Sequence, residues 1–408
     1  MLATIAGVLV AGMVFVIIGV VCLIGIVAGS TSSPQTEMKD NSVFVLRLEG
    51  SLTERSTEDP ISLFMGDEYG AGLDDILSAI RKAKESKQIK GIHLSARNFA
   101  CSPASMQAIR NALLDFKKSG KFLTAYGDNY TQGTYYIASV ADKLIINPSG
   151  NIQWHGLSAQ TLFYKNLLDK LGVEMQIFRV GTYKSAVEPY TSTQMSEANK
   201  EQTQAFISSI WNQILTDVSV SRHIPVGELN ALADKNMDYQ PAQTYLKAGL
   251  ADTLMYKDQV EDYLKNLTQC KADDLKSLNL EAMTNVAAPQ PAPSDNTIAV
   301  YYAYGEIDGA GSSYNGIDSE TMASDLRKLR KDKDVKAVVI RVNSPGGSAF
   351  GSEQIWREVA LLKAEKPVVV SMGDYAASGG YYISCAAHKI VAEPTTLTGS
   401  IGIFGMVP

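Results

Sequence analysis

Residues 127–137 read GDNYTQGTYYI and residues 373–383 read GDYAASGGYYI, so the chain carries one pattern twice, 246 positions apart. The same offset aligns the chain with itself without a gap over roughly residues 73–156. Three further identities fall in this register, Lys143, Pro148 and Gly156 on Lys389, Pro394 and Gly402. Self-similarity of this length indicates a tandem duplication of one structural unit.

Short apolar runs alternate with helical spacing inside each copy. In the first copy the runs Ser42–Leu48, Gln88–Leu94 and Lys121–Tyr126 predict strands, and Leu73–Ser86 and 104–118 predict the helices between them. Strands that alternate with helices favour βαβ units with right-handed crossovers and a parallel sheet. The sequence therefore predicts an α/β protein built from tandem βαβ domains.

The pattern divides the chain into domains. The first repeat is expected over residues 41–282, including a helical extension over 195–267. A Pro- and Ala-rich stretch, 283–295, predicts an interdomain linker. The second repeat, 296–408, is expected to be incomplete, because residue 408 corresponds to about residue 162 of a first copy that continues much further.

The N-terminal segment differs from everything that follows. Residues 1–36 contain no charged side chain, and 2–28 are almost wholly apolar. We expect residues 1–30 to form a transmembrane anchor, because the run is long enough to span a bilayer and longer than a signal-peptide core. Cleavage near Val27-Ala28-Gly29 and a buried core helix are the alternatives. No basic residue flanks the run, so charge does not orient it.

Composition excludes several classes of protein. Hydrophobic residues make up 45% of the chain and charged residues 20%, which are ordinary globular values. The net charge of -6 disfavours binding to nucleic acid. The four cysteines are far apart and form no CxxC pair, so neither a zinc site nor a disulfide framework is indicated.

The two copies differ at positions that matter chemically. The second copy has Asn343-Ser344-Pro345-Gly346-Gly347-Ser348 where the first has Arg97-Asn98-Phe99-Ala100-Cys101-Ser102. Ser378 falls on Gln132, and Ser400 falls on Trp154. A fold would survive these changes, whereas a serine nucleophile beside a glycine loop would not. The first copy therefore looks catalytically empty at these positions.

Ser378 is the candidate nucleophile. It follows a predicted strand, Pro367–Met372, and a predicted Gly373-Asp374 turn, and it opens a predicted helix, Gly379–Ala387. Free N–H groups at a helix N-terminus favour developing negative charge, and the N–H of Gly379 is a candidate oxyanion donor. The Gly346-Gly347 loop is expected alongside. A helix N-cap at Ser378 and a plain glycine turn are the alternatives.

A serine hydroxyl needs a base. The four histidines are His93, His155, His223 and His388. His93 falls within a predicted buried strand, and none of the four has a motif that supports a Ser-His-Asp triad. A lysine in an uncharged setting is the alternative base, since burial lowers its pKa. Lys184 suits this role, although by composition alone a solvated surface lysine is the commoner case.

Four segments together resemble the signal peptide peptidase A (protease IV) family in its long, tandem-repeat form. These segments are VGTYKSA at 180–186, RVNSPGG at 341–347, DYAASGGYY at 374–382 and TGSIG at 398–402. The resemblance covers nearly the whole chain. It implies a ClpP/crotonase-like fold and a Ser/Lys protease mechanism without metal or cofactor.

The resemblance also implies roles for individual residues. Ser378 would be the nucleophile, Lys184 the general base and Ser400 the serine that orients the lysine. Gly379, and less certainly Gly346 or Gly347, would form the oxyanion hole. A homo-oligomer, by resemblance a homotetramer, would sit on the bacterial cytoplasmic membrane with its catalytic domains on the periplasmic side. Its substrates would be cleaved signal peptides and other extended apolar peptides.

Two other functions remain open at this point. A crotonase-type acyl-CoA hydratase or isomerase would use paired backbone N–H groups on a thioester, with Glu188 or Asp374 as the acid/base. A catalytically inactive membrane scaffold of the same fold would need no site at all, and Gln132 in the first copy shows that such a site is dispensable.

Overall fold

A computed structural model describes residues 7, 12–15, 19, 36–56, 72–270, 275–287, 294–309 and 316–408. The expected anchor, residues 1–30, and the middle of the expected linker lie almost wholly outside these ranges. Among the residues that are described, no helix combines the length and the apolar character needed to cross a membrane.

The first half of the chain forms a parallel six-stranded sheet in the order β6-β4-β3-β2-β1-β7. Its strands are β1 (Ser42–Ser51), β2 (Ile89–Ala100), β3 (Phe122–Tyr130), β4 (Lys143–Ile152), β6 (Thr253–Leu254) and β7 (Ser277–Leu278). The crossover helices are α3 (Leu73–Glu85), α4 (Pro103–Lys117) and α5 (Gln132–Ala138). Both the strands and the helices predicted for this half are confirmed, with the strands longer than expected.

The second half forms its own parallel sheet, in the order β13-β12-β11-β8, with β14 also paired to β12. These strands are β8 (Thr297–Tyr304), β11 (Val335–Ser344), β12 (Val368–Ala377), β13 (Lys389–Val391) and β14 (Leu397–Gly399). Three helices connect them, α14 (Ser319–Lys331), α15 (Ala349–Glu365) and α16 (Gly379–Ser384), and a short parallel pair, β9 (Glu306–Ile307) and β10 (Gly316–Ile317), lies beside them.

Equivalent elements of the two halves begin 246 residues apart. This holds for α3 and α14, for β2 and β11, for α4 and α15, for β3 and β12, and for β4 and β13. Each half has its own apolar core, around Phe44, Ile92 and Leu123 in the first and around Val338, Val359 and Val370 in the second. The chain is thus an α/β protein with parallel sheets, as the alternation of strands and helices predicts.

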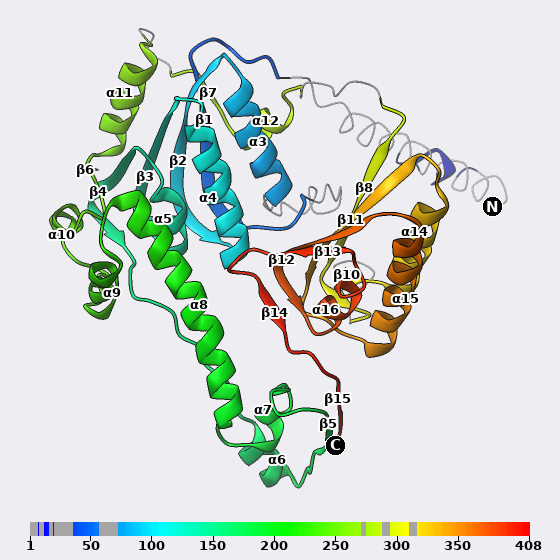
Figure 1. Cartoon of the computed structure of the whole chain (residues 1–408). Coiled ribbons are helices and arrows are strands. Elements are labelled where there is room, and N and C mark those ends of the chain that lie inside the picture. The colour runs from blue at the N-terminus through cyan, green and yellow to red at the C-terminus, as the bar shows by residue number, and fades with distance from the viewer. Residues whose placement is uncertain are drawn as a thin grey trace.

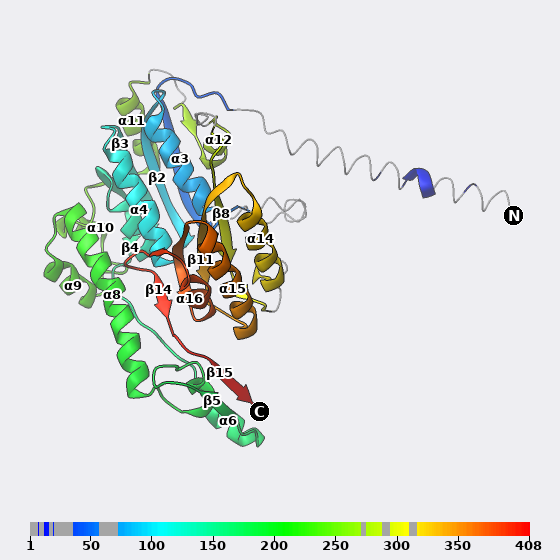
Figure 2. The same cartoon turned by 45° about the vertical axis from the view of Figure 1, so that its right-hand side comes forward.

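An arm extends from the first half along the long helix α8 (Glu197–Arg222), as Figures 1 and 2 show. The arm carries α6 (Lys165–Leu171), β5 (Gln176–Arg179) and α7 (Glu188–Thr191) at its far end. The last strand of the second half, β15 (Phe404–Val407), pairs antiparallel with β5. A part of the first half is thereby brought to the second half, close to where β14 ends.

Shorter helices complete the first half. They are α9 (Val226–Asp234), α10 (Ala242–Lys247), α11 (Lys257–Thr268) and α12 (Leu280–Thr284). The aromatic side chain of Trp154 is fully buried in the core of this half and donates a hydrogen bond from Nε1 to the carbonyl oxygen of Leu229. The counterpart of Ser400 in the first half is therefore a core residue.

The two halves also meet along a polar seam. The buried carboxylate of Glu54 forms an ion pair with Arg341 and accepts a hydrogen bond from Asn343 Nδ2 (3.0 Å). Asp374 accepts hydrogen bonds from the backbone N–H (2.8 Å) and the hydroxyl (2.7 Å) of Ser105, near the start of α4. Since buried charges are costly unless they are paired, these contacts fix how the halves sit together.

Candidate active site

Ser378 lies between the end of β12 and the start of α16. The prediction of a turn at Gly373-Asp374 is wrong, because β12 continues through both residues to Ala377, where it pairs with β14. The predicted helix from Gly379 is confirmed but ends at Ser384, three residues earlier than expected. Ser378 therefore stands at an abrupt junction of strand and helix.

The backbone of Ser378 is strained. Its φ of 51° and ψ of -114° lie in a region that L-residues rarely adopt. Such a conformation costs on the order of 1–3 kcal/mol and persists only where the surroundings enforce it. Here the Ser378 N–H donates to the carbonyl oxygen of Gly399 (2.8 Å). Ser378 occupies the N-cap position of α16, but its side chain makes no capping hydrogen bond, so the hydroxyl is available for another partner.

The Gly346-Gly347 loop packs directly against this junction. A Cβ on Gly346, which has a φ of 101°, would lie 2.6 Å from the nitrogen of Gly379 and 2.8 Å from Cβ of Ser378. The N–H of Gly346 donates to Ser344 Oγ (3.1 Å), and its carbonyl oxygen accepts from the N–H of Ile307 (2.9 Å). Both polar groups of Gly346 are therefore in use.

Gly347 and Gly379 differ from Gly346 in this respect. Within the described residues, the N–H of neither one has a hydrogen-bond acceptor. Gly347 also has a φ of 148°, and a Cβ there would lie 2.2 Å from the carbonyl oxygen of Ile307. One backbone donor thus comes from the glycine loop and the other from the first residue of α16, which is the kind of pair that stabilises an oxyanion.

Lys184 of the arm reaches Ser378 of the second half. Its Nζ lies 3.2 Å from Ser378 Oγ, 3.1 Å from Ser400 Oγ and 3.0 Å from the carbonyl oxygen of Ser400. Lys184 is only 4% exposed, so the alternative of a solvated surface lysine is wrong. The structure brings together the three side chains that the sequence singled out.

The amine of Lys184 is buried against neutral groups, the oxygens of Ser378 and Ser400. Burial lowers the pKa of Lys184 from its usual value, because removal from water penalises the charged amine. The ring of Phe404 lies 5.8 Å from Nζ. A lysine in this setting is neutral more often at a given pH than a lysine in water, and only the neutral amine accepts a proton.

The backbone around Lys184 is tied to α8 through Glu188, a link that sequence reasoning missed. Arg179 Nη1 donates to the carbonyl oxygen of Lys184 (3.3 Å) and lies 4.0 Å from Glu188 Oε1. The buried Glu188 carboxylate accepts from Ser196 Oγ (2.5 Å), from the Ser196 N–H (3.2 Å) and from Asn199 Nδ2 (3.0 Å). It therefore joins the lysine loop to the start of the helix.

Burial opposes the charge on Glu188, but hydrogen bonds from Ser196 and Asn199, with Arg179 nearby, together hold its pKa below the usual glutamate value. Glu188 is thus an ionised carboxylate whose oxygens are already engaged, as are those of Asp374 in the seam. Neither is placed as the free acid/base that the hydratase alternative requires.

Histidine contributes nothing to the described contacts of Ser378 and Lys184. His93 is buried in β2, where its Nδ1 lies 2.9 Å from Thr124 Oγ1, and burial lowers its pKa to about 4. His388 Nδ1 accepts from the backbone N–H of Val368 (3.1 Å). Both are structural histidines.

The first half retains the shape of the site without its chemistry. The Gln132 side chain accepts from the N–H groups of His155 (3.0 Å) and Gly156 (3.1 Å) and donates to the Gly156 carbonyl oxygen (3.0 Å). The amide therefore binds the segment after β4, and the hydroxyl–amine pair of the second half has no equivalent among these residues.

The sequence of this chain is similar to a peptidase family and to several known proteins. The model of peptidase family S49 matches residues 115–271 and 360–408, together about half of the chain. "Protease 4" of Salmonella typhi is 40% identical over 96% of this chain and 65% of its own length. "Protease 4" of Haemophilus influenzae is 38% identical over 95% of this chain and 66% of its own. The chain thus spans about two thirds of the curated relatives that it matches.

A solved structure, a mutant of the 1510-N membrane-bound stomatin-specific protease, matches 27% of this chain and 49% of its own, with 23% sequence identity and a TM-score of 0.22. The family of this chain is assigned from the long sequence matches and from the family model, and not from this structural likeness. The residues that the family model matches include Lys184, Ser378 and Ser400. On that ground, the chain belongs to peptidase family S49.

Proposed function

We propose that this protein is a membrane-anchored serine endopeptidase that uses a Ser378/Lys184 dyad to degrade cleaved signal peptides and other extended apolar peptides. One observation carries the proposal: the Lys184 amine lies 3.2 Å from the Ser378 hydroxyl and also contacts Ser400. A serine is activated when a base lies within hydrogen-bond reach of its hydroxyl and a third group orients that base.

In the first step, neutral Lys184 takes the hydroxyl proton while Ser378 Oγ bonds to a peptide carbonyl carbon. The carbonyl oxygen becomes an oxyanion that accepts hydrogen bonds from the N–H groups of Gly379 and Gly347. Removal of one such donor typically costs about 10²–10³-fold in kcat. Gly346 contributes through its shape, because it lets the loop approach Ser378.

In the second step, protonated Lys184 returns the proton to the leaving amine, and the C–N bond breaks to leave an acyl ester on Ser378. Water then gives a proton to Lys184 as its oxygen attacks the ester carbon. Collapse of this intermediate releases the carboxylic acid product and returns the proton to Ser378 Oγ. Ser400 Oγ, 3.1 Å from Nζ, holds the amine in position throughout.

We further propose that the two halves are tandem ClpP/crotonase-like units over 41–282 and 296–408, joined by the 283–295 stretch, whose first residues Met283 and Val286 pack into the core of the first half. The matching starts of their elements support this. The apolar run at 2–28 supports a membrane anchor. The bacterial cytoplasmic membrane as its location, with the catalytic domains on the periplasmic side, is what the family resemblance implies.

A homo-oligomer, by family resemblance a homotetramer, fits the surface of the arm. Leu162, Leu171, Phe178 and Val180 are exposed on the arm, and Ile401 and Ile403 are exposed just before β15, the strand that pairs with β5. Exposed apolar side chains that gather into one patch would mark an interaction site. A second copy of the chain would cover it.

Labelling with a fluorophosphonate probe tests the proposed chemistry. The protein should be modified at Ser378, and Ser378→Ala and Lys184→Ala should each abolish labelling. Lys200→Ala is the matched control, because Lys200 is an exposed lysine of α8 that pairs with Glu197. Labelling that survives Lys184→Ala would assign the base to another group. Thioester turnover without peptide cleavage would replace the protease with a crotonase-type enzyme.

A further inference from the structure

A cavity of about 770 Å³ lies at the seam between the two halves. Leu52, Phe99 and Met106 line it from the first half, and Tyr304, Pro345 and Tyr375 line it from the second. Tyr304 and Tyr375 are 44% and 41% exposed as whole residues. A cavity of this size, bordered by accessible aromatic rings, has the dimensions of a ligand pocket.

The cavity occupies, in the first half, the place that the candidate active site occupies in the second. Its walls include Phe99, Ala100 and Cys101, which correspond to Pro345, Gly346 and Gly347 at the offset of 246. Thr131 and Gly133 also line it, on either side of Gln132, the counterpart of Ser378. A hollow thus lies at the place in the first half where Gln132 stands instead of the serine.

The two carboxylates that line the cavity are already engaged. Asp374 binds Ser105, and Asn343 donates to Glu54. Cys101 is no replacement nucleophile, since burial and then the charge of Asp374 raise the pKa of its thiol. The contacts left for a ligand are therefore mainly with apolar and aromatic side chains.

Two of the residues that line the cavity belong to the segments that build the candidate active site. Pro345 directly precedes Gly346 and Gly347, and Tyr375 is three residues before Ser378, on the strand that leads to it. We propose that this cavity is a non-catalytic subsite that takes a large apolar side chain of the extended peptide whose carbonyl lies at Ser378. The inference deepens the proposed function and rests on it for the identity of the substrate.

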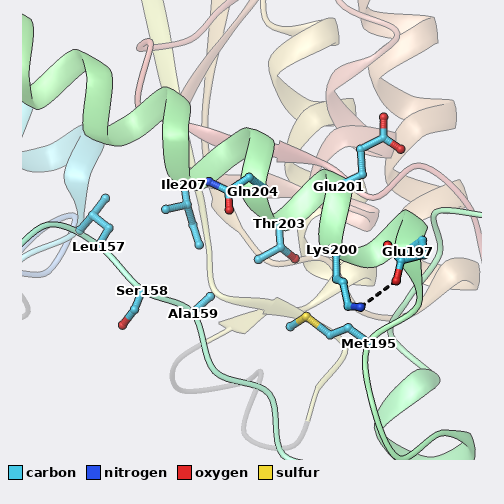
Figure 3. A pocket seen from close by; sticks show the side chains of 10 residues that line it. All are labelled: Leu157, Ser158, Ala159, Met195, Glu197, Lys200, Glu201, Thr203, Gln204 and Ile207. Atoms are coloured by element: carbon cyan, nitrogen blue, oxygen red, sulfur yellow. Dashed lines mark hydrogen bonds and ion pairs between the residues drawn. The ribbon is translucent and has the colours of Figure 1, made fainter.

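The proposal is tested by a substitution that fills the cavity. Ala100 lines it and is exposed, so Ala100→Trp should fold and occupy part of the space. Ala159→Trp is the matched control. It places the same side chain in a different cavity, of about 580 Å³, between the 157–159 segment and α8, where Lys200 pairs with Glu197 (Figure 3).

Binding is measured on the full chain in a Ser378→Ala background, by anisotropy of fluorescent peptides that carry Phe, Ala or Lys at one scanned position. We expect the Phe peptide to bind about tenfold more tightly than the Ala peptide at one position, as burial of a large apolar side chain implies. Ala100→Trp should remove that preference, and Ala159→Trp should retain it.

Two results would overturn the subsite. One is a Phe preference that survives both Ala100→Trp and Met106→Ala, a second variant that enlarges the cavity. The other is a preference for the Lys peptide, which would indicate an acidic pocket instead. Because anisotropy needs no chemistry at Ser378, it is read separately from fluorophosphonate labelling of the unmodified chain. Absence of that labelling would refute the proposed function but would say nothing against the binding subsite.

Discussion

The amine of Lys184 lies 3.2 Å from the hydroxyl of Ser378, although 194 residues separate the two along the chain. Lys184 comes from the arm of the first half, and Ser378 comes from the junction of β12 and α16 in the second. The pairing of β5 with β15 brings the segment that carries Lys184 next to the segment that follows Ser378. Neither half holds the pair by itself, so the chemistry depends on how the halves are joined.

The first prediction concerns pH. Burial lowers the pKa of Lys184, and the neutral amine is the form that accepts a proton. The neutral fraction grows as pH rises through that pKa, so kcat/KM should increase with pH and level off below the usual lysine value of 10.5. A pH profile of peptide hydrolysis measures this. A flat profile from mildly acidic to alkaline pH would exclude Lys184 as the base.

The second prediction concerns removal of the base. Lys184→Ala should lower kcat by about 10²–10⁴-fold, the usual contribution of a positioned general base. The fold should persist, because the lost contacts are the hydrogen bonds to Ser378 and Ser400. Single-turnover kinetics and circular dichroism measure the two effects. Loss of the folded signal together with activity would make the result structural rather than catalytic.

The third prediction concerns the glycine loop. Gly346→Ala should lower kcat by about 10²–10³-fold, because its Cβ would lie 2.6 Å from the nitrogen of Gly379 and push a donor out of place. Gly120→Ala is the matched control. Gly120 also has a positive φ, 76°, but nothing lies within 4 Å of the added Cβ. The control should lose about 1 kcal/mol of stability and keep its kcat. Equal losses of kcat in both would implicate backbone strain instead.

Local patterns in the sequence predicted much of this site, because each motif sits at the end of one strand. Glycine spacing marked the Gly346-Gly347 loop. Lys184 lies in an uncharged stretch, and it was singled out as the base only together with the family resemblance. The turn at Gly373-Asp374 was predicted wrongly, because pairing of β12 with β14 is a tertiary contact that extends the strand. Periodicity within one segment carries no information about such pairing.

The contacts between the two halves could not be predicted from the sequence for the same reason, because they are tertiary contacts. Glu54 and Arg341 are separated by 287 residues, and nothing near either one indicates the other. Glu188 was read as a possible acid/base, whereas its partners Ser196 and Asn199 show a different role. The sequence showed only a glutamate in an otherwise uncharged stretch. That pattern did not indicate which residues the carboxylate of Glu188 would contact.

The fourth prediction concerns the seam. Glu54→Ala should destabilise the protein by about 3–5 kcal/mol, because it leaves Arg341 without its buried carboxylate partner. Glu49→Ala is the matched control. Glu49 pairs with Arg97 at 3.5 Å, with both side chains about half exposed, and such pairs contribute about 0–1 kcal/mol. Urea denaturation followed by fluorescence measures both. Similar midpoints for the two variants would show that the seam does not hold the halves together.

The fifth prediction separates positioning from chemistry at Glu188. Glu188→Gln keeps the size of the side chain but replaces one acceptor oxygen by a donor, which faces the donors of Ser196 and Asn199. Hydrogen bonds to a buried charged group contribute about 1.5–3 kcal/mol each, so the lysine loop should loosen from α8. The expected result is a kcat/KM about tenfold lower, with the pH profile of the dyad retained.

Glu197→Gln provides the comparison for Glu188→Gln, since Glu197 is an exposed residue of α8 that pairs with Lys200. It should leave both kcat/KM and the rate of fluorophosphonate labelling unchanged. A Glu188→Gln variant that labels as poorly as Lys184→Ala would place the carboxylate in the proton transfer itself. A slower reaction with the same dependence on pH would instead mean that Glu188 acts through the position of Lys184, because a positioning residue changes how often the amine meets Ser378 and not which group accepts the proton.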